Sequence, residues 1–302
     1  MLRKKILKKI YFTTFIVFIL FIISSFTINK NILNIKVEYH TNVSSIYLLN
    51  DDGYLLKVNV LVNDNIMESI PLVINNLKVG NKHYSGLKGL IPNNTRINSI
   101  NIKKNILEID FNSALLDVNS NMEEKIIESL VYSLLSFSDI KGIKITINNQ
   151  KLDYLPKSKI KLDEILTKDF GINKDYSITS INDVQKVTIY YYKEKDKTNY
   201  YVPVTKYLNS HDDKIKIIID NLKNSYLSKT NLMSYLNEKI KIASYEQKDN
   251  IVTLSFANLL DFNEEQVEEE VIYTLANSIF DSTDATKVIF LANDTIIDIK
   301  AK

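Results

Sequence analysis

The sequence predicts an α+β protein in which one domain occurs twice behind an N-terminal hydrophobic segment. The strongest evidence is a repeat with an offset of 145 residues, in which KKNILEIDFNSALLD at 103–117 is matched by KDNIVTLSFANLLDF at 248–262. Apolar stripes with helical spacing recur at the same offset on both sides of this stretch. Because an internal repeat means one structural unit used twice, it determines the fold before any single motif does.

Length and composition agree with two globular domains. The chain has 302 residues, of which 45% are apolar and 25% are charged, and this is enough for two separate cores. Residues 1–30 contain six basic side chains and no acidic one, so the remaining 32 basic and 36 acidic side chains leave a net charge of −4. This balance argues against a nucleic-acid partner.

A basic flank and an uncharged run open the chain. MLRKKILKK is followed by a stretch without charge from Ile10 to Phe26, which extends over Thr27 and Ile28. This run is about long enough to cross a hydrocarbon core, and lysines ahead of it orient the N-terminus toward the cytoplasm. We therefore expect residues 1–30 to form an uncleaved transmembrane anchor, with a cleaved signal peptide as the alternative. Because cysteine is absent, disulfides and a lipid-bearing cysteine are excluded.

Each copy is expected to open with two strands and a helix. The strands are SIYLLN and YLLKVNVLV in the first copy and VTIYYY and YYVPV in the second. The helix of each copy has an apolar stripe at spacings of three and four, which buries one face. The stripe consists of Ile70, Val73, Ile74 and Leu77 in the first copy and of Ile215, Ile218, Ile219 and Leu222 in the second.

A hairpin, a second helix and a closing strand are expected next. Leu107, Ile109 and Phe111 alternate with polar residues, as Val252, Leu254 and Phe256 do, and this period predicts half-buried strands. RINSINI and KIASYEQ supply their hairpin partners across the tight turns at 103–105 and 248–250. Apolar helices at 122–135 and 267–280 lead to the closing strands at 143–147 and 288–292.

The predicted order per copy is therefore β-β-α-β-β-α-β. We expect a mixed or antiparallel sheet in each copy, with two helices on one face. The first domain is expected over residues 31–149 and the second over 186–302, with a loosely packed linker at 150–185.

With these elements in order, the chain resembles the GerM domain family. The resemblance rests on VTIYYY with YYVPV, on IDNLKN, on IVTLSFANLLDFN, and on EEEVIYTLANSIF with its closing strand. It implies tandem domains similar to the ring-building motif, a role in sporulation and spore germination, and a complex between the mother-cell and forespore membranes. The chain departs from the family in having no cysteine to carry a lipid. Its first copy also has YLLKVNV where the second has YYVPVTK.

No motif in the sequence predicts catalysis, a cofactor or a metal site. His40, His83 and His211 are too far apart in sequence to suggest a histidine-rich metal site. Ser210-His-Asp-Asp213 is interpreted as a helix cap rather than an acid–base pair. Asp51-Asp52-Gly53 is interpreted as a hairpin turn rather than part of a calcium loop. The acidic cluster of Glu264, Glu265, Glu268, Glu269 and Glu270 is interpreted as charge at the start of a helix, with attraction of a basic partner or divalent ions as the alternative.

The tyrosine-rich strands are the one candidate interaction surface. They carry Tyr190, Tyr191, Tyr192, Tyr200 and Tyr201. Because side chains alternate along a strand, at least one of the first three is expected to face solvent, where tyrosine suits sugar or protein contacts. A strand pair whose tyrosine hydroxyls are satisfied within the fold is the structural alternative.

We expect a non-enzymatic, single-pass membrane protein whose domains lie outside the cytoplasm and act as an assembly scaffold. The partners implied by the resemblance are other sporulation membrane-complex proteins or further copies of the chain, with the membrane contacted through the N-terminal helix. The alternatives are a module that binds peptidoglycan or a germinant, and a cell-wall hydrolase, which would need convergent carboxylates or a metal cluster.

Overall fold

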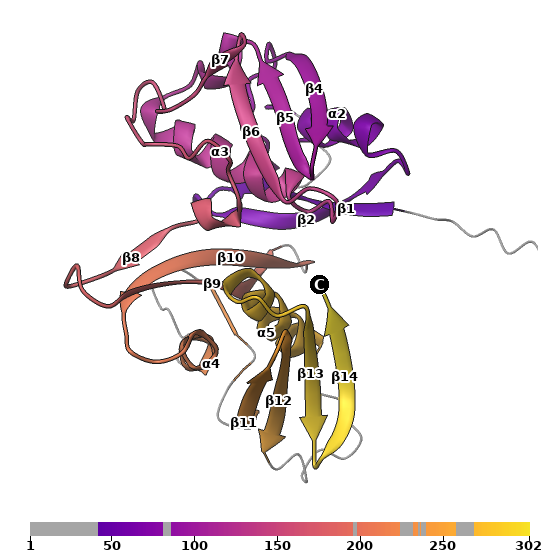
Figure 1. Ribbon diagram of the computed structural model, residues 1–302, viewed down its shortest axis with the longest axis vertical. Helices are drawn as coiled ribbons and strands as arrows, with labels where there is room; N and C mark the ends of the chain where they lie inside the picture. Colours follow the sequence, from indigo (N-terminus) through magenta and orange to yellow (C-terminus); the bar gives the residue numbers. More distant parts are fainter. Residues whose placement is uncertain are drawn as a thin grey trace, which may run out of the picture. The chain divides into compact units, whose positions relative to one another are not determined.

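Both repeats contain the predicted elements in the predicted order, with one further strand at the end of each repeat and the short β3 (Leu87–Lys88) in addition in the first. The computed structural model describes residues 42–80, 86–195, 198–223, 232–234, 236, 240–257 and 269–302, and Asn42–Lys302 form one compact unit (Figure 1). In these residues no helix has the length and apolar character needed to cross a bilayer. The predicted anchor at residues 1–30 lies outside the described residues.

The first repeat has the order ββαβββαββ, with a short strand between its first helix and its hairpin. Its elements are β1 (Asn42–Asn50), β2 (Leu55–Val62), α2 (Ile66–Asn76), β3 (Leu87–Lys88), β4 (Ile97–Lys103), β5 (Ile106–Phe111), a 3-10 turn η1 (Ser113–Leu116), α3 (Ser120–Leu134), β6 (Gly142–Ile147) and β7 (Gln150–Lys151).

The second repeat follows a connecting segment with two short elements. The connection contains the 3-10 turn η2 (Lys168–Phe170) and β8 (Asp175–Ser177). The repeat itself consists of β9 (Val184–Lys195), β10 (Thr198–Asn209), α4 (Lys214–Lys223), β11 (Lys241–Lys248), β12 (Ile251–Ala257), α5 (Glu269–Ser282), β13 (Lys287–Ala292) and β14 (Thr295–Ala301).

The hairpin, helix and closing-strand predictions are confirmed in both repeats. β4–β5 and β11–β12 are antiparallel, whereas β5–β6 and β12–β13 are parallel, so each four-stranded sheet is mixed. A register shift falls at Ile97/Ser99 in the first repeat and at the equivalent Ile242/Ser244 in the second. The repeat therefore preserves even a bulge, a local feature that redirects a strand.

The predicted single sheet with two helices on one face is wrong. The opening hairpins are not part of the four-stranded sheets; they join into a separate six-stranded sheet of order β3-β1-β2-β10-β8, with β9 paired to β10. Figure 1 shows α5 between its hairpin and its four-stranded sheet. In α3 all residues from Ile126 to Leu134 are buried, as expected for a helix covered on both sides.

The last strand of each repeat, β7 and β14, follows the predicted closing strand and was not predicted, although the turn before it also repeats. Asn148 and Asn149 have φ of 50° and 62°, and Asn293 and Asp294, at the same offset, have 48° and 61°. Two consecutive left-handed residues form the tight hairpin turn that matches strand twist. β14 thereby adds an antiparallel fourth strand to the sheet of the second repeat.

The connection at 150–185 is packed rather than loose, which corrects the prediction about it. Leu155 and Ile172 are fully buried, and Leu162 and Leu166 are nearly so. Leu166 exchanges two backbone hydrogen bonds with Ile143 of β6, of 2.8 and 2.9 Å. β8 pairs in parallel with β10 of the second repeat. The connection therefore contacts both repeats.

Candidate functional site

The tyrosines of β9 are buried, so the expectation that one of them faces solvent is wrong. Tyr190 and Tyr191 are each 1% exposed and Tyr192 is 7% exposed. All residues from Val187 to Lys193 are buried, so this part of β9 is covered on both faces, whereas the prediction assumed one solvent-exposed face. Tyr200 and Tyr201 of β10 are half-buried, and the Tyr201 ring stacks on Tyr273 of α5 with centroids 3.8 Å apart.

The long helix of each repeat closes the edge of the opening hairpin with hydroxyl groups. In α3, the Ser133 hydroxyl accepts a hydrogen bond of 3.0 Å from the Tyr47 amide of β1. At the equivalent place in α5, the Ser278 hydroxyl accepts one of 2.8 Å from the Tyr190 amide of β9. Ser282 also bonds both backbone groups of Thr188. These serines bond the backbone groups at the strand edge, which a neighbouring strand would otherwise bond. The sequence did not predict this role, because serines on a helix are typical of its solvent-exposed face.

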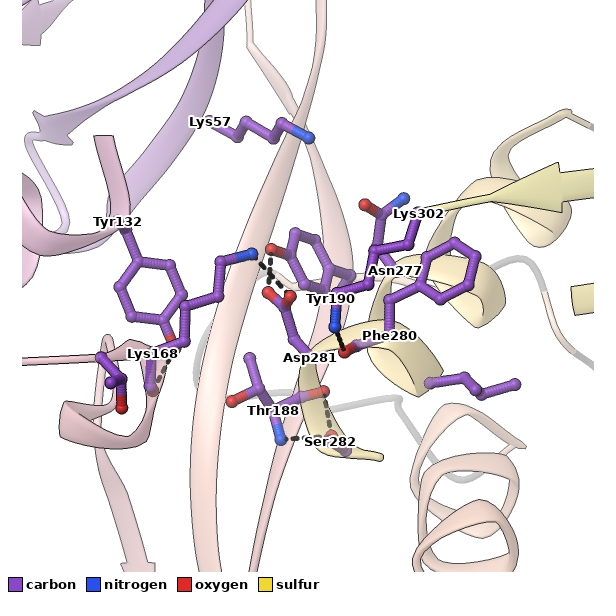
Figure 2. Close-up of polar contacts among 12 residues, drawn as sticks. Lys57, Tyr132, Lys168, Thr188, Tyr190, Asn277, Phe280, Asp281, Ser282 and Lys302 are labelled. Atoms are coloured by element: carbon purple, nitrogen blue, oxygen red, sulfur yellow. Dashed lines mark hydrogen bonds and ion pairs between the residues drawn. The ribbon is translucent and has the colours of Figure 1, made fainter. Parts of the chain in front are cut away.

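Tyr190 and Asp281 form a buried polar network where the repeats meet. The Tyr190 hydroxyl donates to Asp281 Oδ2 at 2.7 Å, and Lys168 Nζ lies 2.6 Å from Asp281 Oδ1 (Figure 2). Tyr47 of the first repeat reaches the Tyr190 hydroxyl at 3.4 Å. Burial, and then the nearby Asp281 carboxylate, raise the pKa of both tyrosines well above the usual range, so they stay neutral hydrogen-bonding groups.

This network lies in a cleft with a volume of about 810 Å³ that both repeats line. Lys57 of β2 extends into the cleft, and its ammonium donates to the Tyr273 hydroxyl of α5 at 2.6 Å. The ammonium also lies 5.2 Å from the centre of the Tyr273 ring. Burial lowers the pKa of Lys57, and the Asp281 carboxylate only partly offsets this. Lys302 donates to the Phe280 carbonyl, at the C-terminal end of α5.

Asn173 is a single buried side chain that fastens the two repeats together. Its side-chain oxygen accepts from the Leu55 amide at 2.9 Å, and its amide donates to the carbonyls of Leu55 and Pro203 at 2.8 Å each. Leu55 belongs to β2 and Pro203 to β10, which are adjacent strands of the six-stranded sheet. The Asn173 backbone amide donates to Glu128 of α3. We call these hydrogen bonds, by which a residue of the connection joins β2 to β10, the clamp at Asn173.

Several predicted interpretations of polar motifs are confirmed. Residues 51–53 form the β1–β2 turn, closed by the Gly53 amide on the Asn50 carbonyl. The start of α4 is capped by Asp213, whose carboxylate accepts from the Lys216 amide at 3.0 Å. His211 is exposed and lies 3.7 Å from Asp183.

Some of the predicted polar residues are not described. His40, His83, Glu264, Glu265 and Glu268 lie outside the described residues, whereas Glu269 and Glu270 lie in the first turn of α5. Within the described ranges, no group of three or more His, Asp or Glu side chains is placed to hold a metal ion. The two aspartates of the cleft each pair with a lysine, Asp281 with Lys168 and Asp169 with Lys186.

The geometry defines a class of protein: a pair of homologous α+β domains fused through one sheet and clamped by their connection. The family model described as "Germane: Sporulation and spore germination" matches this chain at residues 45–153 and again at 188–298, once in each repeat. The chain therefore belongs to this family, and the resemblance to GerM domains is confirmed.

A known protein and a solved structure show the same relationship over most of the chain. The spore germination protein GerM of Bacillus subtilis (strain 168) is 25% identical over 259 residues, which cover 82% of this chain and 70% of that protein. The solved structure of the tandem GerMN domains of the sporulation protein GerM from Bacillus subtilis matches with a TM-score of 0.74 at 23% identity. The match covers 84% of this chain and 91% of that structure. The match to the solved structure shows that this chain has the tandem-domain fold.

Proposed function

We propose that the chain is a non-enzymatic, membrane-anchored scaffold that acts outside the cytoplasm in sporulation and spore germination, supporting a ring or channel complex between mother cell and forespore. The observation that carries the proposal is the family match in both repeats, together with the 25% identity to the spore germination protein GerM. The clamp at Asn173 adds support, because a scaffold must hold its binding surfaces at a fixed separation.

A difference between the repeats indicates where a protein partner would bind. On the outer face of the first four-stranded sheet, Glu108 pairs with Lys144 and Asp110 with Thr146. The equivalent pairs in the second sheet are Thr253 with Ile289 and Ser255 with Leu291. The second sheet therefore has an uncharged residue at each of the three positions that are charged in the first. Two of the four positions, Ile289 and Leu291, are aliphatic.

The apolar character of the second sheet continues onto β14. Ile299 pairs with Ile289 and Ile296 with Leu291, and these two β14 residues are 49% and 56% exposed. A contiguous exposed apolar patch on a protein surface marks an interaction site. We infer that the outer face of the second sheet, defined by Ile289, Leu291, Ile296 and Ile299, binds a protein of the sporulation complex.

The test is imaging of the full chain with a fluorescent tag through sporulation, together with pulldown from sporulating membranes. The wild-type chain is expected to concentrate at the engulfing septum. The double variant Ile289→Lys with Leu291→Thr is expected to fold, because the first repeat has these residues at the equivalent positions, but to lose the enrichment and the co-purifying proteins.

The matched control is Ile181→Lys, which makes the same chemical change at a side chain that is 93% exposed and lies in the connection. It should behave as wild type. Uniform distribution of the wild-type chain in vegetative and sporulating cells would refute the sporulation role. Normal septal enrichment of the double variant would refute the assignment of the surface alone.

A further inference from the structure

The cleft between the repeats has an excess of positive charge. Its lining contains five lysines and two aspartates: Lys57, Lys141, Lys168, Lys300, Lys302, Asp169 and Asp281. The chain beyond residue 30 is acidic overall, with 36 acidic against 32 basic side chains. The excess in the cleft is therefore a local concentration and does not follow from the composition.

Three of these lysines lack an ionic partner. Lys168 pairs with Asp281, and Lys300 pairs with Asp298 at 2.9 Å. Lys57, Lys141 and Lys302 have no carboxylate within ion-pair distance in the part of the chain that the structure describes. Burying Lys57 costs the most free energy of the three. Its half-buried ammonium has lost contacts with water, and in exchange it contacts only the neutral hydroxyl and the ring of Tyr273.

The aspartates of the cleft are already engaged, and this fixes the sign of the ligand. Both oxygens of Asp281 are occupied, one by Lys168 and one by the Tyr190 hydroxyl. Asp169 pairs with Lys186, which lies outside the cleft lining. Among the described side chains of the cleft, a cation would find no carboxylate without a lysine partner. An anion would find three ammonium groups without an ion-pair partner, of which Lys57 and Lys302 donate only to the neutral oxygens of Tyr273 and Phe280.

The distribution of the lysines indicates an extended anion rather than a compact one. Lys57 lies on β2, Lys141 lies between α3 and β6, and Lys302 follows β14 (Figure 2 shows Lys57 and Lys302 around Tyr190 and Asp281). Among the described residues no arginine lines the cleft, so the bidentate guanidinium contact that favours phosphate is missing. The C-terminal turn of α5 also lines the cleft and disfavours phosphate and carboxylate alike, so the lysines must outweigh it. The volume of about 810 Å³ is typical of small-molecule sites.

We propose that this cleft binds a small organic anion with two or three separated carboxylates, held by Lys57 from the first repeat and Lys302 from the second. The inference goes beyond the scaffold role and does not depend on it. Because the ligand would contact both repeats, it would also strengthen their association.

The test is titration calorimetry of the full chain in detergent with citrate, inorganic phosphate and acetate as separate probes at constant ionic strength. Citrate is expected to bind measurably and at least tenfold more tightly than acetate or phosphate. Equal binding of the three probes would refute selective carboxylate recognition. Absence of citrate binding at millimolar concentrations would overturn the proposal altogether, and so would tighter binding of phosphate than of citrate.

Variants assign the binding to the cleft. Lys57→Met keeps the aliphatic stem and removes the charge, and it should weaken citrate binding roughly tenfold to a hundredfold, the size of one charge-assisted hydrogen bond. Lys103→Met is the control, since this lysine lies on β4 outside the cleft with a side chain that is 69% exposed. Circular dichroism and the midpoint of thermal unfolding verify that both variants fold. Unchanged citrate affinity in folded Lys57→Met would refute the site.

Discussion

The clamp at Asn173 is the feature of this fold that can be tested most sharply. Replacing Asn173 by alanine removes three hydrogen bonds to buried backbone groups, at the Leu55 amide, the Leu55 carbonyl and the Pro203 carbonyl. Asn173 is 3% exposed, so water cannot easily replace these bonds. Lys125 loses its 3.0 Å contact with the same side-chain oxygen.

The substitution is expected to lower the free energy of unfolding in two ways, through the lost hydrogen bonds and through the backbone conformation. A buried backbone group left without its partner costs about 1–3 kcal/mol, so three of them with partial relaxation amount to about 4 kcal/mol. Asn173 also has a φ of 48°, and alanine in the left-handed region costs about 1 kcal/mol. We expect the free energy of unfolding to fall by about 5 kcal/mol in total, a large part of the 5–15 kcal/mol typical of a native protein.

Two matched variants separate the cost of the lost hydrogen bonds from the cost of the left-handed backbone. Asn293→Ala changes an exposed asparagine that also has a φ of 48°, so it should cost only the backbone term of about 1 kcal/mol. Asn173→Gly relieves the backbone term while losing the side chain, so it should cost about 4 kcal/mol.

The assay is urea unfolding followed by both circular dichroism and tyrosine fluorescence. In Asn173→Ala the two signals should separate into two transitions as the repeats unfold independently, whereas in wild type they should coincide. If Asn173→Ala loses no more stability than Asn293→Ala, the three hydrogen bonds of Asn173 do not hold the repeats together.

Three further predictions follow from buried polar groups. Ser278→Ala leaves the Tyr190 amide without its acceptor, and urea unfolding should show a loss of about 1–3 kcal/mol; no loss would mean that β9 needs no closure of its edge. Burial alone would raise the pKa of Asp110, but three hydrogen bonds to its carboxylate hold this pKa below the ordinary 3.8. The stability from Asp110 is therefore present above about pH 4 and lost as the pH falls through its folded pKa, so acid unfolding should be less steep in Asp110→Asn than in wild type; parallel curves would contradict this. Glu123→Ala removes the acceptor of the Ser158 amide, 2.7 Å away, and hydrogen–deuterium exchange should be faster at that amide; an unchanged exchange rate would show that the turn holds without Glu123.

Much of the core could be predicted from the sequence because the period of its apolar residues reports burial directly. Leu107, Ile109 and Phe111, and their counterparts in the second repeat, are all buried as their alternation indicated. The stripe of α2 is likewise buried at each of its four positions. These positions depend on local periodicity and were reinforced by the repeat.

The layering and the cleft could not be predicted in the same way. Hydroxyl residues such as Ser133 and Ser278 occupy the second buried face of their helices, so the hydropathy pattern of a solvated face concealed a covered one. Lys57, Asp281 and Lys302 come from separate elements without a shared offset, and only tertiary contacts bring them together. The burial of Tyr190, Tyr191 and Tyr192 could not be predicted for the same reason, because burial of both faces of a strand depends on its neighbours in the fold.

The six-stranded sheet leaves no strand edge of the second hairpin free for a further copy of the domain, within the described residues. Along β10, one side is taken by β9 and the other is divided between β2 and β8. The outer side of β9 is closed by Ser278 and Ser282. Gene duplication can lengthen a solenoid indefinitely because every unit offers its successor the same surface. Among the described residues of the second repeat, the edges of β9 and β10 are already occupied, so this hairpin does not offer the open strand edge that β2 offered to β10. The pair is a closed unit.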